Sequence, residues 1–295
     1  MLTAYIVGLL VFGLVQAYPS PAELEPAYVS DNINSRVVGG WEATEGQFPY
    51  QVNIRLVANN GAVYSCGGSV IHKNWVLTAA QCTANRIKYL IRFGVVELVR
   101  PTLILEETSE NNFLHPGYNP NLSGVQGDDI AMIRLSRDLP FGPTIQPIRL
   151  QNSEQMNRNY AGDILTVSGF GLTQDIWHGG TVSSVLRWVY LRGISNAQCR
   201  IIYFSVHPQT VCAMYYNNTI QSACQGDTGG PLTIVDEDGE LTQIGIVSFG
   251  AVYGCSSPFP SAFVRPGHYH DWIYDVTGID LDWSSSPRLL RSHEE

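Results

Sequence analysis

Apolar and polar side chains alternate with a period of two along the segment that begins at Tyr50. The apolar members Tyr50, Val52, Ile54 and Leu56 are separated by Gln51, Asn53 and Arg55. This period places the apolar side chains on one face of a β-strand. The pair Asn60-Gly61 follows, and Asn-Gly readily adopts the positive φ angles of a tight hairpin turn. We therefore predict that residues 62–71 form the return strand of a hairpin with one buried face.

A second turn and strand are predicted near the C-terminal end. Asp238-Gly239 precedes an apolar-rich strand over residues 241–247, which leads into residues 248–250. Helical periodicity is scarce before residues 270–274, where a short helix is predicted to end at Gly278. Since no repeat or low-complexity linker interrupts the chain between residues 37 and 278, we expect one all-β unit there.

Composition narrows the range of functions. The chain has 295 residues, of which 44% are hydrophobic and 15% charged, as in a globular protein with a large core. Its formal net charge is -9 and its only lysines are Lys73 and Lys88. Because phosphate binding needs clustered Lys and Arg, nucleic acid is not expected as a partner.

The N-terminal segment predicts export. Residues 4–15 are apolar but too short to span a bilayer comfortably, and they end at the small-residue site Val15-Gln16-Ala17. We expect a signal peptide over residues 1–17 and a secreted protein without membrane insertion, with a membrane anchor as the alternative. Secretion permits disulfides.

Six cysteines are present, and their spacing alone leaves fifteen pairings open. No Cys-x-x-Cys spacing occurs, so no structural zinc site is expected. We expect neither a metal nor a cofactor.

Two short segments resemble the chymotrypsin-like (trypsin-fold) serine peptidases. Residues 223–231 resemble the nucleophile loop of that family, but Thr228 stands where the family has serine. Residues 78–82 resemble the segment of the general base, but Gln81 stands where the family has histidine. The orienting acid is matched by Asp129, which precedes a strand-like segment.

The resemblance covers residues 37–278. It implies two packed six-stranded antiparallel β-barrels with a short C-terminal helix and with the site in the cleft between the barrels. It also implies that the cysteines pair in chain order, as Cys66–Cys82, Cys199–Cys212 and Cys224–Cys255.

The two replacements remove the proton chemistry of acyl transfer. That reaction needs a hydroxyl nucleophile, a base with a pKa near neutrality, an acid that orients the base, and donors for the oxyanion. The amide of Gln81 is not basic, but it can donate a hydrogen bond to Asp129. Thr228 keeps a hydroxyl with an added methyl group, and the backbone N–H groups of Gly226 and Thr228 are expected to remain as oxyanion donors. We expect catalysis to be lost.

A substitute base is not expected. None of the seven histidines lies where the base is expected. They fall on a strand, in loops, in the C-terminal helix or in the tail, and they are His72, His115, His178, His207, His268, His270 and His293.

The resemblance also implies an activation site. Cleavage between Arg36 and Val37 would remove residues 18–36 as an activation peptide and bury the new amine beside Asp227.

The specificity pocket of the family corresponds to Ser222 at the floor and to Gly250 and Ser261 at the walls. Without an acid at the floor, an apolar or small side chain is the expected occupant. An empty remnant pocket is the alternative.

Two sequons, at Asn121 and Asn217, lie in predicted loops and are candidate glycosylation sites. Residues 279–295 extend beyond the usual end of the family, and we expect them to be mobile.

Together these features predict a secreted, catalytically inactive serine protease homologue that resembles arthropod members of the family. It is expected to be a monomer that binds an extracellular protein or peptide, such as another protease or its inhibitor, as a cofactor or decoy in a protease cascade. One alternative is an active endopeptidase of chymotrypsin-like or elastase-like preference. Another is a degenerate gut protein under little constraint.

Overall fold

The computed structural model describes residues 40–175, 178–204, 206–217, 221–250, 254–255 and 257–284. The predicted signal peptide (1–17), the predicted activation peptide (18–36) and the bond after Arg36 lie outside these residues. His293 and the end of the predicted tail, residues 285–295, also lie outside them.

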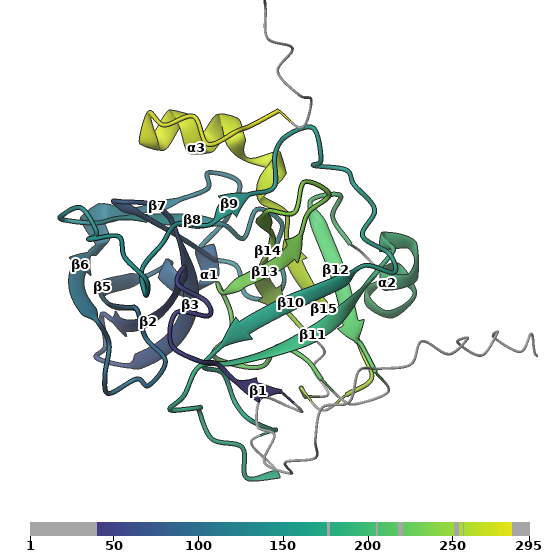
Figure 1. Cartoon of the computed structure of the whole chain (residues 1–295), viewed down its shortest axis with the longest axis horizontal. Helices are drawn as coiled ribbons and strands as arrows, with labels where there is room; N and C mark the ends of the chain where they lie inside the picture. The colour runs from purple at the N-terminus through teal and green to yellow at the C-terminus, as the bar shows by residue number, and fades with distance from the viewer. Residues whose placement is uncertain are drawn as a thin grey trace, which may run out of the picture. The chain divides into compact units, whose positions relative to one another are not determined.

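Two β-sheets form the described part of the chain (Figure 1). The first has the order β6-β5-β2-β3-β4-β8-β7. Its strands are β2 (Gln51–Ala58), β3 (Val63–His72), β4 (Trp75–Thr78), β5 (Arg86–Phe93), β6 (Leu103–Thr108), β7 (Asn112–Leu114) and β8 (Ala131–Arg134).

The second sheet has the order β1-β11-β10-β13-β14-β15-β12, with β9 paired to β14. Its strands are β1 (Trp41–Glu42), β9 (Arg149–Leu150), β10 (Ile164–Gly169), β11 (Arg187–Ile194), β12 (Thr210–Tyr215), β13 (Pro231–Val235), β14 (Leu241–Phe249) and β15 (Ser261–Val264). The helices are α1 (Ala80–Thr83), α2 (Asn196–Tyr203) and α3 (His270–Thr277), and short 3-10 turns cover Ser109–Asn111 and Pro266–His268.

The predicted all-β class with two barrel-like sheets is confirmed. Six longer strands form each sheet, and the two- or three-residue strands β7, β1 and β9 extend them beyond the expected count. In the second sheet β12 also pairs with β11, which closes the six longer strands into a barrel. The pairing of β9 with β14 is parallel, unlike the other pairings, which are antiparallel.

The first hairpin forms where it was predicted. β2 and β3 pair in register from Gln51–Ser69 to Val57–Val63, and Gly61 at the turn has a φ of 80°. The prediction of a single buried face was wrong, however, because Gln51 and Asn53 are also buried. Gln51 Oε1 accepts a hydrogen bond of 2.8 Å from Ser168 Oγ of β10. Gln51 is thus covered by the second sheet, whereas Asn53 bonds to Ser65 and Arg92 within the first sheet.

Separate apolar cores stabilise the two sheets. The first core includes Ile54, Leu77 and Met132 of the first sheet together with Ile273 of α3. The second core lies within the closed barrel and includes Leu165, Leu191 and Phe263. Helix α3 ends as predicted, since Gly278 adopts the left-handed conformation with a φ of 69°.

The disulfides connect Cys66 with Cys82, Cys199 with Cys212, and Cys224 with Cys255. These are the pairs implied by the family resemblance. Two of them lie beside the candidate site, since Cys82 is next to Gln81 and Cys224 precedes Thr228 by four residues.

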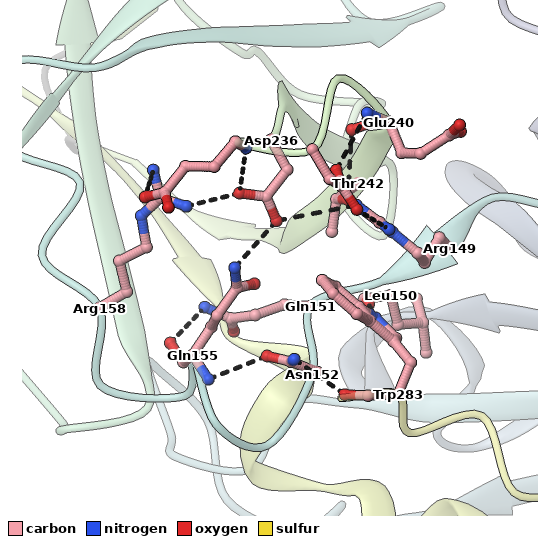
Figure 2. A network of polar contacts seen from close by, with 12 residues as sticks. Arg149, Leu150, Gln151, Asn152, Gln155, Arg158, Asp236, Glu240, Thr242 and Trp283 are labelled. Carbon is pink, nitrogen blue, oxygen red and sulfur yellow. Dashed lines mark hydrogen bonds and ion pairs between the residues drawn. The ribbon is translucent and has the colours of Figure 1, made fainter. Parts of the chain in front are cut away.

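Residues 279–284 differ from the expectation of a mobile tail, because they are anchored to the segment around β9. Trp283 Nε1 donates to the backbone oxygen of Leu150 at 2.7 Å, and the Arg149 guanidinium lies 3.9 Å from the centre of the Trp283 ring. Asn152 Nδ2 donates to the Trp283 backbone oxygen at 2.8 Å (Figure 2). Asp282 accepts hydrogen bonds from the backbone and side chain of Ser153.

Candidate functional site

Gln81 lies on α1, directly after β4 of the first sheet. Its backbone N–H donates to Asp129 Oδ1 at 2.8 Å, and its side-chain Nε2 donates to Asp129 Oδ2 at 2.5 Å. The same Nε2 donates a second hydrogen bond of 2.8 Å to the backbone oxygen of Ser248. The predicted hydrogen bond from the Gln81 amide to Asp129 is present, and the contact with Ser248 was not foreseen.

Asp129 is the buried centre of this arrangement. Its side chain is only 2% exposed and also accepts a hydrogen bond of 2.6 Å from Ser248 Oγ. Burial raises the pKa of the Asp129 carboxyl above its ordinary value, although the hydrogen bonds from Ser248 and Gln81 act in the opposite direction. The carboxylate is therefore held in one orientation by Gln81 and by β14.

The amide of Gln81 cannot take a proton. Both N–H bonds of its Nε2 point at oxygen acceptors, on Asp129 and Ser248. The remaining polar atom, Oε1, is an acceptor of hydrogen bonds but not a base near neutral pH. Gln81 thus stands beside the acid with a group that is not a base near neutral pH.

Thr228 is placed by a loop of the second sheet that contacts the first. Its backbone oxygen accepts a hydrogen bond of 2.8 Å from the N–H of Gly67 on β3, and Cys82 Sγ lies 3.5 Å from the same oxygen. Thr228 and Gln81 border two adjoining cavities that share Ser248 and Phe249 in their walls. Within the described part of the chain, the Thr228 hydroxyl makes no hydrogen bond with another residue.

Four backbone N–H groups of residues 223–231 have no acceptor among the described residues, those of Ala223, Gln225, Gly226 and Thr228. The expected oxyanion pair, Gly226 and Thr228, is among them, whereas the Asp227 N–H between the two donates to the backbone oxygen of Cys224. Gly226 has a φ of 100°, and a Cβ there would lie 3.0 Å from the Cα of Gly171. Glycine is therefore required for the turn that leaves this pair of donors free.

The predicted pocket residues line one cavity of about 130 Å³ with Thr228 at its border. Ser222, Gly250 and Ser261 all contribute to it, and both serine side chains are buried. Ser222 Oγ donates to the backbone oxygen of Cys255 at 2.5 Å. None of the described lining residues is acidic or basic, so the cavity suits a small uncharged or apolar side chain.

Sequence reasoning missed two aromatic residues of this pocket. Phe249 and Phe259 also line it. The position of Phe249, between the predicted strand and the expected pocket residue Gly250, could have indicated that it lines the pocket. The position of Phe259 depends on the fold of a long loop and has no such signal in the sequence.

Asp227 is buried behind the nucleophile loop. Gly171 N–H donates to its Oδ1 at 2.7 Å and Cys224 N–H donates to its Oδ2 at 2.8 Å. Burial raises the pKa of the Asp227 carboxyl to about 6. No cation pairs with it among the described residues, and its expected partner, Val37, lies outside them.

Four of the six described histidines contact other groups of the chain. His72 contacts Asn74, His178 lies 3.7 Å from Asp175, and His270 Nε2 contacts the backbone oxygen of Gln151. His115 packs against the rings of Tyr269 and Trp272. None of the six described imidazoles forms a hydrogen bond with Thr228 or Gln81.

Asn121 and Asn217 are exposed. Both therefore lie where a glycan could be carried, although residues 218 and 219 of the second sequon are outside the described part. The described residues contain no cluster of three or more His, Cys, Asp or Glu side chains suited to a metal ion. No helix within them is long and apolar enough to cross a membrane.

Comparisons with known proteins agree with this geometry. A collagenase from Hypoderma lineatum is 32% identical over 273 residues, which are 92% of this chain and 98% of the collagenase. Serine protease 1 from Drosophila melanogaster is 35% identical over 257 residues, which are 87% of this chain and 91% of the relative. The human chymotrypsin-like elastase family member 3A is 30% identical over 94% of this chain and 98% of its own length.

A solved structure of HL collagenase has the same fold. It superimposes with a TM-score of 0.72 at 30% sequence identity, and the match covers 82% of this chain and 99% of the collagenase chain. The family model described as Trypsin matches residues 37–273, which include every candidate site residue from Val37 onwards. The chain therefore belongs to the trypsin family of serine peptidases.

Proposed function

We propose that this chain is a catalytically inactive member of the trypsin family that acts by binding an extracellular protein or peptide. The observation that carries the proposal is the double donation of the Gln81 amide to Asp129 and Ser248. Acyl transfer requires that a base at this place accept the proton of the nucleophile and return it to the leaving group. An amide that donates twice performs neither step.

The nucleophile supports the same conclusion. Thr228 has no base beside its hydroxyl among the described residues, and its added methyl group occupies space at the border of the pocket. Removal of a nucleophile or a base from such a triad lowers turnover by about a millionfold, with effects that do not add.

The binding surface is retained. The cavity at Ser222, Gly250 and Ser261 is open to a small or apolar side chain, and the adjoining cavity of about 230 Å³ at Gln81 extends it. We propose that a peptide segment of another protease, or of its inhibitor, occupies these cavities, so that the chain works as a monomeric cofactor or decoy in an extracellular cascade. The apolar run over residues 4–15 supports secretion.

Processing after Arg36 belongs to the same proposal. The buried Asp227 carboxyl has hydrogen bonds but no cation beside it in the described residues. A new amine at Val37 would supply that cation, as in the active members of the family, and would order the loop that carries Gly226.

A competing function is that of an active endopeptidase of chymotrypsin-like or elastase-like preference. It is favoured by the retained Asp129, by the free N–H groups of Gly226 and Thr228, and by relatives that are named as a collagenase and an elastase family member. Activity would require a proton acceptor at Thr228 other than the described histidines.

The two functions are separated by treating the full chain with trypsin, verifying cleavage after Arg36, and then measuring reaction with an organophosphonate probe and turnover of peptides with apolar side chains. We expect neither labelling nor turnover above that of the trypsin-only control. Labelling of Thr228 together with turnover would overturn the proposed inactivity. If neither labelling nor turnover is found, the cleaved chain can be used as bait for affinity capture from the fluid that contains it, to identify the partner.

A further inference from the structure

A cavity of about 440 Å³ lies beside the N-terminus of α2, in the second sheet's half of the molecule. The residues that line it with polar groups are Asn157, Asn159, Ser195, Asn196, Arg200 and Arg265. No described lining residue is acidic, and none of them lines the cavities at Thr228 and Gln81. The cavity is thus a separate feature of the molecule.

Arg265 is the buried group of this cavity, with only 6% of its surface exposed. Its Nε donates to the backbone oxygen of Thr210 at 3.1 Å, and its Nη1 donates to the backbone oxygen of Arg158 at 2.6 Å. These two bonds fix the plane of the guanidinium. Nη2 donates to no described residue, and it is not fully enclosed by protein atoms. Since Arg265 lines the cavity, Nη2 is a donor left for a ligand there.

Arg265 forms no ion pair with a described carboxylate. Other arginines with largely buried side chains do so, since Arg149 pairs with Asp238, Arg158 with Asp236, and Arg187 with Glu42. A buried cation without a counter-charge is costly in a folded protein. Burial accordingly lowers the pKa of the Arg265 guanidinium. The missing counter-charge is the first indication of an anionic ligand.

Helix α2 supplies further donors to the lining of the cavity. Arg200 follows Asn196 by four residues on α2, which places the two side chains on one helix face, and Arg200 is exposed without an ion pair in the described chain. The capping box takes only the N–H groups of Ser195 and Gln198, so the N–H groups of Asn196 and Ala197 remain free. The first turn of α2 contains no acidic residue. Its backbone therefore adds partial positive charge toward the cavity.

We propose that this cavity binds a tetrahedral oxyanion, sulfate or phosphate, either as the free ion or as an ester group on a small molecule, between Arg265 and Arg200. Guanidinium groups and backbone N–H groups are the donors that bind such oxygens in proteins, and this cavity has both. The chain's formal net charge is -9, so general attraction of anions does not account for binding here. The ligand is recognised by the local arrangement of donors.

The test is titration calorimetry on the full chain with inorganic phosphate, inorganic sulfate and glucose 6-phosphate, each at constant ionic strength set with chloride. Four proteins are compared: the unmodified chain, Arg200→Gln, Arg265→Lys and Arg137→Gln. Arg137 is exposed and outside the cavity, so its replacement removes the same charge without touching the site. Because Arg265 donates to three backbone oxygens, of Thr210, Met156 and Arg158, its replacement can disturb the interior. Arg200→Gln provides an independent variant that leaves the interior intact.

We expect the unmodified chain and Arg137→Gln to bind the anion. The affinities of Arg200→Gln and Arg265→Lys should be at least about tenfold lower, because each substitution removes a charge-assisted hydrogen bond. Glucose 6-phosphate that binds more tightly than phosphate would identify an ester ligand, and equal affinity would identify the free ion. Absence of binding by the unmodified chain, or equal affinity in all four proteins, would overturn the proposal. A rise in Tm with sulfate alone does not count in its favour, since sulfate stabilises folded proteins in general.

Discussion

The side-chain nitrogen of Gln81 lies 2.5 Å from Oδ2 of Asp129 and at the same time 2.8 Å from the backbone oxygen of Ser248. One amide thus joins α1, the segment before β8, and β14. A histidine at this place would direct one nitrogen to the acid and leave the other for a hydroxyl. Gln81 instead directs both N–H bonds of one nitrogen to fixed oxygens, on Asp129 and Ser248.

The first prediction concerns stability. Gln81→Met keeps the length of the side chain but removes its N–H donors, so the hydrogen bonds to Asp129 and Ser248 are lost. Since Asp129 is buried, we expect the free energy of unfolding to fall by about 2 kcal/mol. Denaturant titration of the two proteins measures the difference.

The matching comparison is Gln81→Met in an Asp129→Ala background. There the carboxylate that needs the donor is already absent, so the same substitution should cost clearly less. An equal loss in both backgrounds would show that Gln81 stabilises the fold through packing rather than through this hydrogen bond.

The second prediction concerns chemistry. In the double variant Gln81→His with Thr228→Ser, the acid, the base, the nucleophile and the free N–H groups of Gly226 and residue 228 would all be present. After cleavage following Arg36, we expect the double variant to hydrolyse peptides with apolar side chains at least about a thousandfold faster than either single variant. The reason is that the members of a catalytic triad act as a unit. Turnover of a peptide substrate after trypsin treatment measures this.

The double variant must first be shown to be folded and cleaved after Arg36. If it then reacts no faster than the single variants, the replacements at residues 81 and 228 are not sufficient to explain the proposed inactivity. The pocket at Ser222 would be the next part of the site to test.

Local sequence patterns predicted the parts of the fold that depend on local contacts. The hairpin of β2 and β3 follows from period-two alternation and from a turn that needs a positive φ at Gly61. The end of α3 follows from Gly278. The disulfide pairs came from the family resemblance, because spacing alone leaves all pairings open.

Contacts between distant segments were not predictable in the same way. Gln81 and Ser248 are 167 positions apart, so the second hydrogen bond of the amide has no local signal. The burial of Gln51 likewise depends on Ser168 of the other sheet. Composition indicates how many polar groups a chain has, but only the packing of the two sheets decides which of them become buried partners.

The third prediction concerns the C-terminal segment. Trp283 bonds to Leu150 and Asp282 bonds to Ser153. Ser284 is the last described residue. We expect a chain truncated after Ile279 to lose about 2 to 4 kcal/mol of unfolding free energy, from lost hydrogen bonds and from the contact between Arg149 and Trp283. Denaturant titration gives the value.

A chain truncated after Ser284 is the control for that measurement. It removes eleven residues but keeps the anchoring contacts, so its stability should remain within about 0.5 kcal/mol of the full chain. If both truncations behave alike, the contacts of Trp283 contribute nothing measurable to the fold.

The last prediction concerns pH and Asp227. Burial raises the pKa of this carboxyl from an ordinary value of 3.8 to about 6. The folded state therefore holds a proton on Asp227 over a range where the unfolded state has released it. In the uncleaved chain this group's contribution to stability is fully present below about pH 4 and is lost as pH rises through about 6, by about 3 kcal/mol in total.

Other carboxyls act in the opposite direction, since the pKa values of Asp236 and Asp282 are lowered by their hydrogen bonds and neighbouring charges. The measurement is therefore a difference between the uncleaved chain and its Asp227→Asn variant, each unfolded by denaturant at several values between pH 4 and pH 7.5. The variant loses a hydrogen-bond acceptor, which shifts its free energy of unfolding by an amount that does not depend on pH. The difference between the two free energies of unfolding should therefore change by about 3 kcal/mol in favour of the variant as pH rises. Parallel curves would mean that Asp227 already has a cationic partner before cleavage. After cleavage following Arg36 the gap should instead stay constant over this range, because a buried amine at Val37 would keep the carboxyl ionised in the folded state.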